Sequence, residues 1–273
     1  MVNRISNGLA IFDPDHTELL RELDAAFAGW AAEAGADQIS VPPVYPVEDL
    51  EKFDVYDNFP HLALVAGALA DPERDRPEGH RLPPDRLAGA HLGLPTAACF
   101  GAYLYFENRR IPPSTLVTLV NRCFRNEEYF DGLRRLLGFQ MREVVALGDS
   151  EHVSEVLAGF TGRIAAFLDA LDLEYGSAAA TDPFFDREGG RAVLQRLQEV
   201  KREFIVDDLA IASVNTHRNF FGERCGITAG DGGNAFTGCV AFGLERWVSV
   251  LLTRYGSAEK AAGAVRSASP GPG

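Results

Sequence analysis

The sequence predicts a single α+β domain in which amphipathic helices and strands share one core. Helical periodicity is clear in three long stretches, and three apolar runs of strand length end at polar loops or Gly-rich turns. The helical stretches are residues 13–35, 150–171 and 244–255, and the strand-like runs are residues 139–147, 209–215 and 237–243. A chain of 273 residues, 46% of them hydrophobic, is long enough for a sizeable core. We expect residues 1–265 to form the domain and residues 266–273 to be a disordered tail.

The first helix has clear sequence signals at both ends. Asp13 before Pro14 provides an N-cap followed by a favoured first helical residue, and Gly35 marks the end. A second helical stretch is expected from Thr115 onward, leading into the segment that begins at Cys123.

The second half of the chain is expected to begin with helices. Ser150 is the expected cap of a long helix, and another helix is expected from about Gly190 to Phe204. Residues 150–204 therefore form a mainly helical segment in this interpretation. Two segments rich in Gly, Pro or charge are expected to be loops, at residues 71–85 and 226–233.

The charge of the chain argues against nonspecific binding of nucleic acid. Twenty-six basic and thirty-nine acidic side chains leave a net charge of −13, and each phosphate contact needs a Lys or Arg. The N-terminus has no export signal, and no apolar run approaches the roughly 20 residues that span a bilayer. We therefore expect a cytoplasmic protein that uses no membrane, with tRNA disfavoured as a partner.

Four cysteines are scattered through the chain without any CxxC pair. They are Cys99, Cys123, Cys225 and Cys239. In a reducing compartment each is a thiol or a metal ligand, and burial as a small apolar side chain is the common case. Spacing alone does not single out a ligand set.

The most informative motif is FRxE, a loop, and RxxxFxxxE. Its six fixed positions are Phe124, Arg125, Glu127, Arg135, Phe139 and Glu143. A guanidinium can clamp an α-phosphate, a carboxylate can accept from an adenine amine, and an aromatic ring can stack on a base. The pattern resembles the second motif of class II aminoacyl-tRNA synthetases, which implies ATP binding by Arg125, Glu127, Arg135 and Phe139. A charged surface hairpin is the alternative reading.

Two further segments resemble the other class II motifs. Residues 241–246 match the third motif, with Ala241 in place of its first Gly, and the resemblance assigns the terminal phosphates of ATP to Arg246. Without the second motif, a solvated Glu-Arg pair at a helix start would be the simpler reading. The GADQISVPP segment ending at Pro43 resembles the first, dimer-forming motif more loosely. The resemblance thus implies an antiparallel sheet flanked by helices, a homodimer, and catalysis by Arg125 and Arg246 with Mg²⁺.

Within class II, the chain resembles the zinc-dependent atypical seryl-tRNA synthetases and their truncated homologues, the amino acid:[carrier protein] ligases. The segments that carry this likeness include LPTAAC, RCFRNEEYFDGLRR, TDPFF, SVNTHRNFFG and TGCVAFGLER. The resemblance implies that the chain activates a glycine- or alanine-like amino acid and transfers it to the phosphopantetheine thiol of a carrier protein. It also implies a zinc site formed by Cys99, Glu143 and Cys239, a donor set that suits tetrahedral Zn²⁺ with one open position.

The segment SVNTHRNFFG and the following cysteine are expected to border the amino-acid pocket. The resemblance assigns pocket roles to Asn215, His217, Asn219 and Cys225. Asn219 replaces an acidic residue that the family tends to have, and Cys225 replaces a tryptophan. Either change can alter the choice of amino acid or disable the site.

Alternatives remain for the acceptor. A small aminoacyl-adenylate synthetase that serves tRNA or a small amine is one, and an inactive paralogue with a binding or regulatory role is another. Little of the chain remains for a tRNA-binding module, which favours a carrier protein. Its expected docking patch consists of Arg187, Arg191, Arg196, Lys201 and Arg202.

Overall fold

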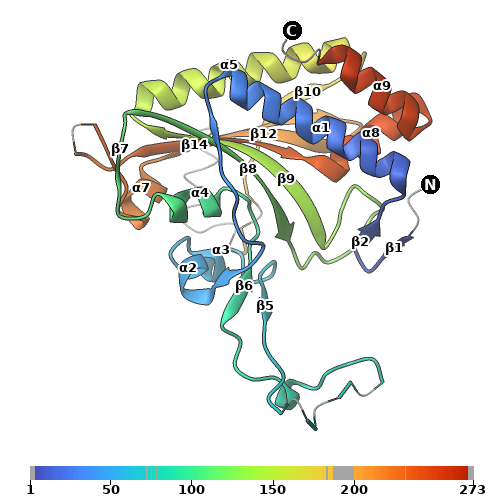
Figure 1. Ribbon diagram of the computed structural model, residues 1–273, viewed down its shortest axis with the longest axis vertical. Helices are drawn as coiled ribbons and strands as arrows, with labels where there is room; N and C mark the ends of the chain where they lie inside the picture. Colours follow the sequence, from blue (N-terminus) through green and yellow to red (C-terminus); the bar gives the residue numbers. More distant parts are fainter. Residues whose placement is uncertain are drawn as a thin grey trace.

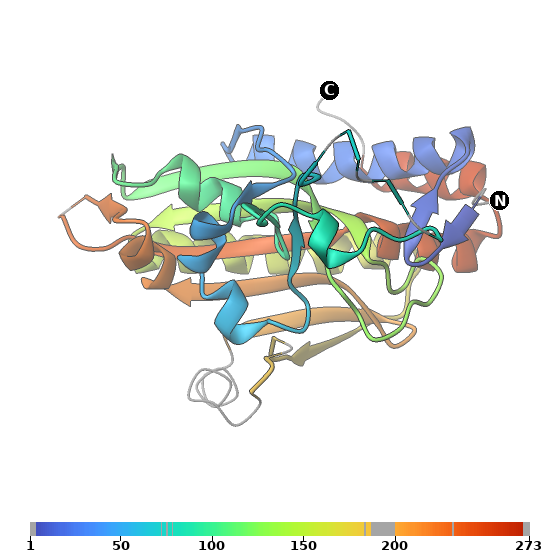
Figure 2. The ribbon, with the colours of Figure 1, turned by 90° about the horizontal axis from the view of Figure 1, so that it is seen from below.

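A seven-stranded sheet organises the chain and confirms the α+β class. The computed structural model describes residues 4–71, 73–74, 76–77, 79–182, 184–186, 200–230 and 232–269. The strand order in the sheet is β10-β11-β12-β14-β9-β8-β3, and neighbours are antiparallel except for the short parallel pair of β3 and β8. Figure 2 shows these strands side by side, with α2 and α3 in front of them.

The sheet is built mainly from long strands of the second half of the chain. In spatial order the strands are β10 (Gly176–Ala179), β11 (Lys201–Val206), β12 (Leu209–Arg218), β14 (Phe236–Gly243), β9 (Gly138–Gly148), β8 (Ser114–Phe124) and β3 (Asp37–Gln38). Successive side chains alternate between the two faces, so each strand contributes to two different layers. The central strands are buried on both sides, which explains their nearly continuous apolar runs.

One face of the sheet carries four long helices. They are α1 (Pro14–Glu33), α5 (Ser150–Ala170), α8 (Leu244–Tyr255) and α9 (Ala258–Ala268), and Figure 1 shows α1, α5 and α9 lying together. Phe27 of α1 stacks on Phe242 of β14 with ring centroids 4.1 Å apart, and Trp247 of α8 packs against the same ring of Phe27. These aromatic contacts form the centre of the larger core.

The opposite face is covered by short elements and holds the second core. These are α2 (Val47–Glu51), α3 (Val55–Asn58), α4 (Phe100–Tyr105), α7 (Phe220–Arg224) and a small sheet of β4 (Tyr45–Pro46), β6 (Leu92–Leu94) and β5 (Leu64–Ala66). Gly222 lets α7 approach closely, because a Cβ at this position would lie 2.2 Å from the carbonyl oxygen of Ala235. This close packing brings the aromatic side chains of α7 toward the sheet.

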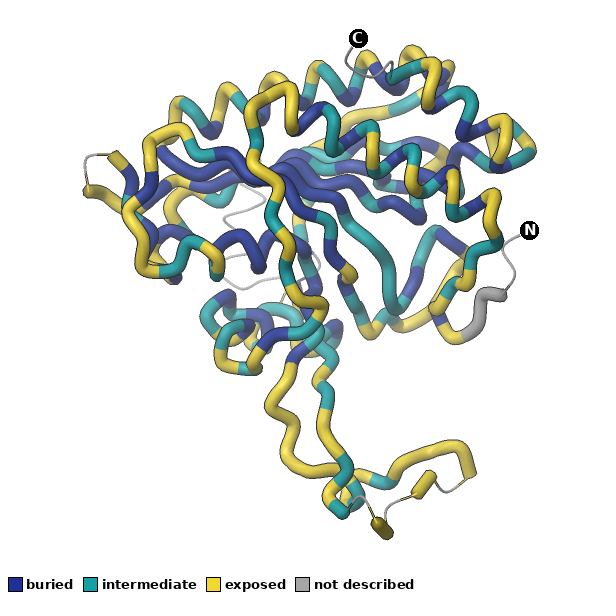
Figure 3. Tube along the Cα trace, in the orientation of Figure 1, coloured by how far each residue is buried: buried dark blue, intermediate teal, exposed yellow. Residues whose placement is uncertain are grey.

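The remaining short elements lie at the edges. They are β1 (Arg4–Ser6), β2 (Leu9–Ile11), β7 (Arg110–Ile111), β13 (Thr228–Ala229) and the 3-10 turn η1 (Pro84–Arg86). The described residues between 67 and 91 form an arm that extends from the body, and Figure 3 shows that most of them are exposed. The expectation of an exposed loop at residues 71–85 is confirmed for the described part of that segment.

Two expectations about secondary structure were wrong within the described residues. The stretch from Thr115 to Phe124 is strand β8, because Val117 and Leu119 face one core while Leu116 faces the other. The helix expected from about Gly190 to Phe204 is contradicted at its end, because residues 201–204 belong to strand β11, whereas α5 covers Ser150–Ala170 as helix. The rest of the expected helix, residues 190–199, lies outside the described residues.

Both ends of the helical layer also differ in detail from expectation. Asp149, not Ser150, caps α5 and accepts a hydrogen bond from the backbone N–H of His152 at 2.8 Å. The expected tail is helical in its first residues, since α9 continues to Ala268 and Arg266 pairs with Glu22 of α1. Residues 270–273 lie outside the described residues.

Candidate active site

Strand register brings the candidate residues onto one face of the sheet. Cys239 of β14 pairs with Asn215 of β12, and Ala241 pairs with Ser213 of β12 on one side and Glu143 of β9 on the other. Residues two apart on a strand share a face, so Cys239 lies on the same side as Ala241 and its partners. This face is the one covered by the short helices.

Cys99, Glu143 and Cys239 form one compact, buried group. Their ligand atoms all lie within 4.8 Å of one another, although the three residues come from the start of α4 and from two central strands. The Glu143 side chain is fixed by the backbone N–H of Ala98, which donates to Oε1 at 2.9 Å. The other carboxylate oxygen, Oε2, is buried and has no hydrogen-bond partner among the described residues.

This group has the chemistry of a metal site. A buried carboxylate oxygen without a partner is costly, and burial raises the pKa of Glu143. The hydrogen bond with Cys239, together with burial, raises the pKa of the Cys99 thiol. A divalent cation would compensate three buried acidic groups at once, and two sulfur ligands with one carboxylate favour Zn²⁺. The residues present therefore fit the metal that the sequence analysis expected.

A cavity of about 390 Å³ lies beside the metal-ligand group and has mainly apolar walls. Aromatic rings from several elements line it: Phe53, Phe59, Phe100, Phe184, Phe220 and Phe221. Its polar side chains include Asn215, whose Nδ2 donates to Ser213 Oγ at 3.1 Å and lies 3.4 Å from the sulfur of Cys239. An apolar chamber with a few converging polar groups is typical of a small-molecule site.

His217 also lines this cavity and is held by a tyrosine. Its Nδ1 lies 3.1 Å from the hydroxyl oxygen of Tyr103, and its Nε2 lies 3.8 Å from the sulfur of Cys239. Burial lowers the pKa of His217 to about 4, so the ring is neutral at physiological pH. Tyr103 is a site residue that sequence reasoning missed, because a tyrosine in a short apolar helix gives no signal of its own.

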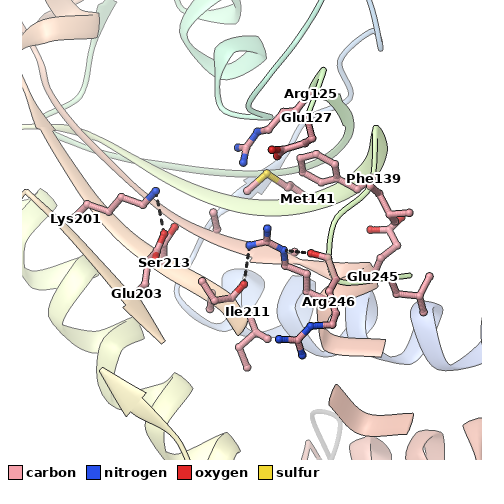
Figure 4. Close-up of a pocket in the computed structure, with 17 residues that line it drawn as sticks. Arg125, Glu127, Phe139, Met141, Lys201, Glu203, Ile211, Ser213, Glu245 and Arg246 are labelled. Atoms are coloured by element: carbon pink, nitrogen blue, oxygen red, sulfur yellow. Dashed lines mark hydrogen bonds and ion pairs between the residues drawn. The ribbon is translucent and has the colours of Figure 1, made fainter. Parts of the chain in front are cut away.

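A second, narrower cavity of about 80 Å³ contains most of the expected ATP-binding residues (Figure 4). Arg125, Glu127, Phe139 and Arg246 all line it. The β8–β9 hairpin explains the grouping of the second-motif residues, because residues 125–137 connect two paired strands. Arg135 joins the group through Glu127, to which its Nη1 donates at 2.7 Å.

Both arginines assigned to phosphates are anchored on main-chain carbonyl groups. Arg125 donates to the carbonyl oxygen of Thr96 from Nε and Nη2, at 3.2 and 3.0 Å, and lies over the ring of Phe139. Arg246 donates to the carbonyl oxygens of Arg134 and Ala210, at 3.0 and 2.9 Å. Since a guanidinium has five N–H donors, each arginine retains donors for an anion.

The residue before Arg246 is a buried acid. The backbone N–H of Gln140 donates to Glu245 Oε2 at 2.8 Å, and burial raises the pKa of Glu245 to about 6. Burial likewise lowers the pKa of Arg246, to about 10, which leaves its guanidinium charged at neutral pH. The third motif is thus largely enclosed and does not form a solvated helix face.

Lys201 connects the two cavities. Its side chain lines both, and its Nζ is held by Asp182 at 2.8 Å and by Glu203 at 3.1 Å. Burial lowers the pKa of Lys201, but the two carboxylates outweigh this effect and raise it. Sequence analysis expected Lys201 in a surface docking patch, and this was wrong because β11 turns its side chain toward the site.

Comparison with known proteins agrees with this geometry. No protein-family model matches the chain. "Amino acid--[acyl-carrier-protein] ligase 1" of Bradyrhizobium diazoefficiens is 33% identical over 240 residues, covering 82% of this chain and 73% of the relative. The chain belongs to the amino acid:[carrier protein] ligase family. It is therefore a ligase, as the sequence analysis expected.

More distant relatives support the same origin. The chain is also similar to a type-2 serine–tRNA ligase of Methanococcus aeolicus, with 26% identity over 285 residues, which cover 93% of this chain and 54% of that protein. The fold matches M. kandleri SerRS, solved with A. aeolicus tRNASec, with a TM-score of 0.81 at 21% identity over 99% of this chain and 59% of that one. The class II synthetase fold predicted from the sequence is confirmed.

The structure separates the four residues expected in the amino-acid pocket of this ligase. Asn215 and His217 line the larger cavity, whereas Asn219 and Cys225 are not among its lining residues. The chain turns after β12, so Asn219 caps α7 at the surface and Cys225 is buried at the far end of that helix. Cys123 is buried in the same core as Cys225 and is not part of the metal-ligand group.

Two other expectations concern residues or properties away from the site. Arg187, Arg191 and Arg196 of the expected docking patch lie outside the described residues, and Arg202 lies on β11. Within the described part of the chain, no helix has the length and apolar character needed to span a bilayer.

Proposed function

We propose that this ligase activates an amino acid with ATP and transfers it to the phosphopantetheine thiol of a carrier protein. One observation carries the proposal: the cavity beside the metal-ligand group and the cavity that contains Arg125 and Arg246 share several lining residues. Residues that line both include Arg125, Lys201 and Ser213. An amino acid held in one cavity can therefore present its carboxylate to a nucleotide held in the other. The named function of the Bradyrhizobium relative supports the carrier protein as acceptor.

In the first step, a carboxylate oxygen of the amino acid attacks the α-phosphorus of ATP. The new P–O bond forms as the bond to the β-phosphate oxygen breaks, and pyrophosphate leaves. A carboxylate is already ionised at neutral pH, so no side chain has to remove a proton. The contribution of the protein is therefore positioning and charge neutralisation by Arg125 and Arg246, with Mg²⁺ arriving on the nucleotide.

The metal-ligand group would position the amino acid. Cys99, Glu143 and Cys239 would hold Zn²⁺, which supplies a Lewis acid able to bind an uncharged amine at its open coordination position. Asn215 and His217 border this point and can contact the rest of the amino acid. A glycine- or alanine-like substrate is our proposal from the family resemblance.

In the second step, the acceptor sulfur attacks the carbonyl carbon of the aminoacyl adenylate. The thioester C–S bond forms, the bond to the AMP oxygen breaks, and the thiol proton leaves to solvent or buffer.

We further propose that the ligase is cytoplasmic and that it is a homodimer. The homodimer follows from the resemblance of the GADQISVPP segment to the dimer-forming motif.

Two assays test this function in sequence. ATP/pyrophosphate exchange, screened over the common amino acids, should show exchange with one or a few small amino acids. The active amino acid, radiolabelled, should then label a holo carrier protein but not the apo form that lacks the phosphopantetheine arm. Exchange with no amino acid would identify an inactive paralogue, and labelling of tRNA with none of holo carrier protein would contradict the proposed acceptor.

A further inference from the structure

Arg218 has an unusual backbone at the edge of the larger cavity. It is the last residue of β12 and has φ of 53°, in the left-handed region that arginine rarely adopts. The pairing of β12 with β14 shifts register between Thr216 and Arg218, and the hydroxyl of Thr237 donates to the carbonyl oxygen of Arg218 at 3.3 Å. Such strained positions persist where the surroundings hold them, and they are concentrated at functional sites.

The side chain of Arg218 differs from the other cations of the cavity. Among the described residues that line the cavity, it alone is exposed. Arg125 is anchored on Thr96 and Lys201 lies between two carboxylates, whereas no ion pair or hydrogen bond of the Arg218 guanidinium is recorded within the described residues. Arg218 is therefore an available cation at the rim.

The rim and the metal-ligand group lie at different depths of one cavity. Arg218 pairs with Thr237, two residues before Cys239 on β14, which corresponds to roughly 7 Å along the strand. The walls of the same cavity also include the aromatic residues Phe220 and Phe221. A ligand that reaches from the metal-ligand group past the rim would be complemented by a reactive group at the buried end, an uncharged middle along the apolar walls, and an anion beside Arg218.

The amino acid cannot supply that outer anion, because its carboxylate is consumed at the α-phosphorus. The acceptor can, since phosphopantetheine has a thiol at one end, an uncharged chain, and a phosphodiester that joins it to the carrier protein. We propose that Arg218 binds this phosphodiester and so recognises the phosphorylated end of the arm. This inference rests on the proposed function and adds a residue that selects the acceptor.

The test compares two soluble acceptors that differ only in the phosphate, pantetheine and 4′-phosphopantetheine. Arg218→Ala should raise the KM for phosphopantetheine about tenfold, the loss expected for one charge-assisted hydrogen bond. The KM for pantetheine and the rate of ATP/pyrophosphate exchange should stay unchanged. Arg218→Lys keeps the positive charge but loses the paired N–H donors of the guanidinium. Its KM for phosphopantetheine should therefore lie between those of the wild type and Arg218→Ala.

A nearby arginine provides the matched control. Arg224 of α7 is also exposed, but its Nη2 already pairs with Asp54 at 2.8 Å, so Arg224→Ala should leave the ratio of the two KM values as in the wild type. Calorimetric titration with each compound gives the same comparison for binding alone. Equal KM changes for both acceptors in Arg218→Ala, or none, would overturn the role of Arg218 and leave the proposed function intact. Adenylate formation by the wild type with labelling of neither thiol nor holo carrier protein would overturn both.

Discussion

Arg142 and Glu143 are consecutive on β9 and serve opposite faces of the sheet. Glu143 points toward Cys99 and Cys239, whereas Arg142 points toward the helical layer and forms a two-pronged ion pair with Asp24 of α1, at 2.7 and 2.8 Å. Both side chains are buried. The strand that carries a metal ligand is thus fixed from behind by the first helix, which links the two layers of the fold at the site.

The pair between Arg142 and Asp24 is expected to matter for stability. Arg142→Met should lower the free energy of unfolding by about 2 to 3 kcal/mol. This loss is at or below the lower end of the range for a broken buried ion pair, because the side chain of Asp24 is 27% exposed and therefore partly solvated. Urea denaturation measures the loss. Replacing both residues, as Arg142→Met with Asp24→Leu, should recover part of it, since no charge is then left unpaired. A double variant less stable than Arg142→Met would contradict this explanation.

The metal-ligand group is expected to bind zinc. The purified ligase should contain about one zinc per chain, and Cys99→Ala or Cys239→Ala should remove both the metal and adenylation activity. Cys123→Ala is the matched control, because Cys123 is equally buried but belongs to the packed core. Metal analysis by mass spectrometry decides the matter, and active wild-type protein free of zinc would exclude the assignment.

Arg246 is expected to act on ATP and also to support the fold. Arg246→Ala should lower the rate of pyrophosphate exchange about a hundredfold, as expected when a preorganised cation is lost. It should also reduce stability by about 1 to 3 kcal/mol, because the carbonyl oxygens of Arg134 and Ala210 lose their donor. Arg254→Ala, at the other end of α8, should change neither the exchange rate nor ATP affinity. Normal exchange by folded Arg246→Ala would show that the third motif has been misread.

Glu245 is expected to make stability depend on pH. Its pKa in the folded chain, about 6, exceeds the ordinary value of 4.5, so its contribution to stability is fully present below pH 4.5 and is lost as pH rises through 6. Glu245→Gln removes this titration and keeps an acceptor for the N–H of Gln140. The variant should therefore gain about 2 kcal/mol over the wild type between pH 4.5 and pH 8. A stability difference that is constant across this range would show that Glu245 ionises normally.

Much of the candidate site was accessible from the sequence because its residues lie in motifs with fixed spacing. Arg125, Glu127 and Phe139 were assigned from the second motif, and the structure places all three in one cavity. The grouping of Cys99 with Cys239 came from family resemblance, since no spacing rule connects cysteines so far apart. Tyr103 and Arg218 were missed, because neither belongs to a recognisable pattern.

The errors in secondary structure have a common physical origin. The run from Ser114 to Phe124 is apolar on both sides, so its periodicity distinguishes helix from strand poorly, and only the pairing with β9 decides between them. Lys201 was expected in the docking patch for the carrier protein, together with Arg187, Arg191, Arg196 and Arg202. In the folded chain, β11 pairs with β12 and turns Lys201 inward to Asp182 and Glu203.

The sequence by itself determined the class of fold, the family and the residue types available for ATP and metal binding, because these depend on local patterns and motif order. Only the tertiary structure decided which of those residues meet. Strand register aligns Glu143 with Ala241, two residues beyond Cys239, and the start of α4 brings Cys99 to them from a distant part of the chain. Register and packing are sums of many contacts across the sheet, and no single segment of the sequence specifies them.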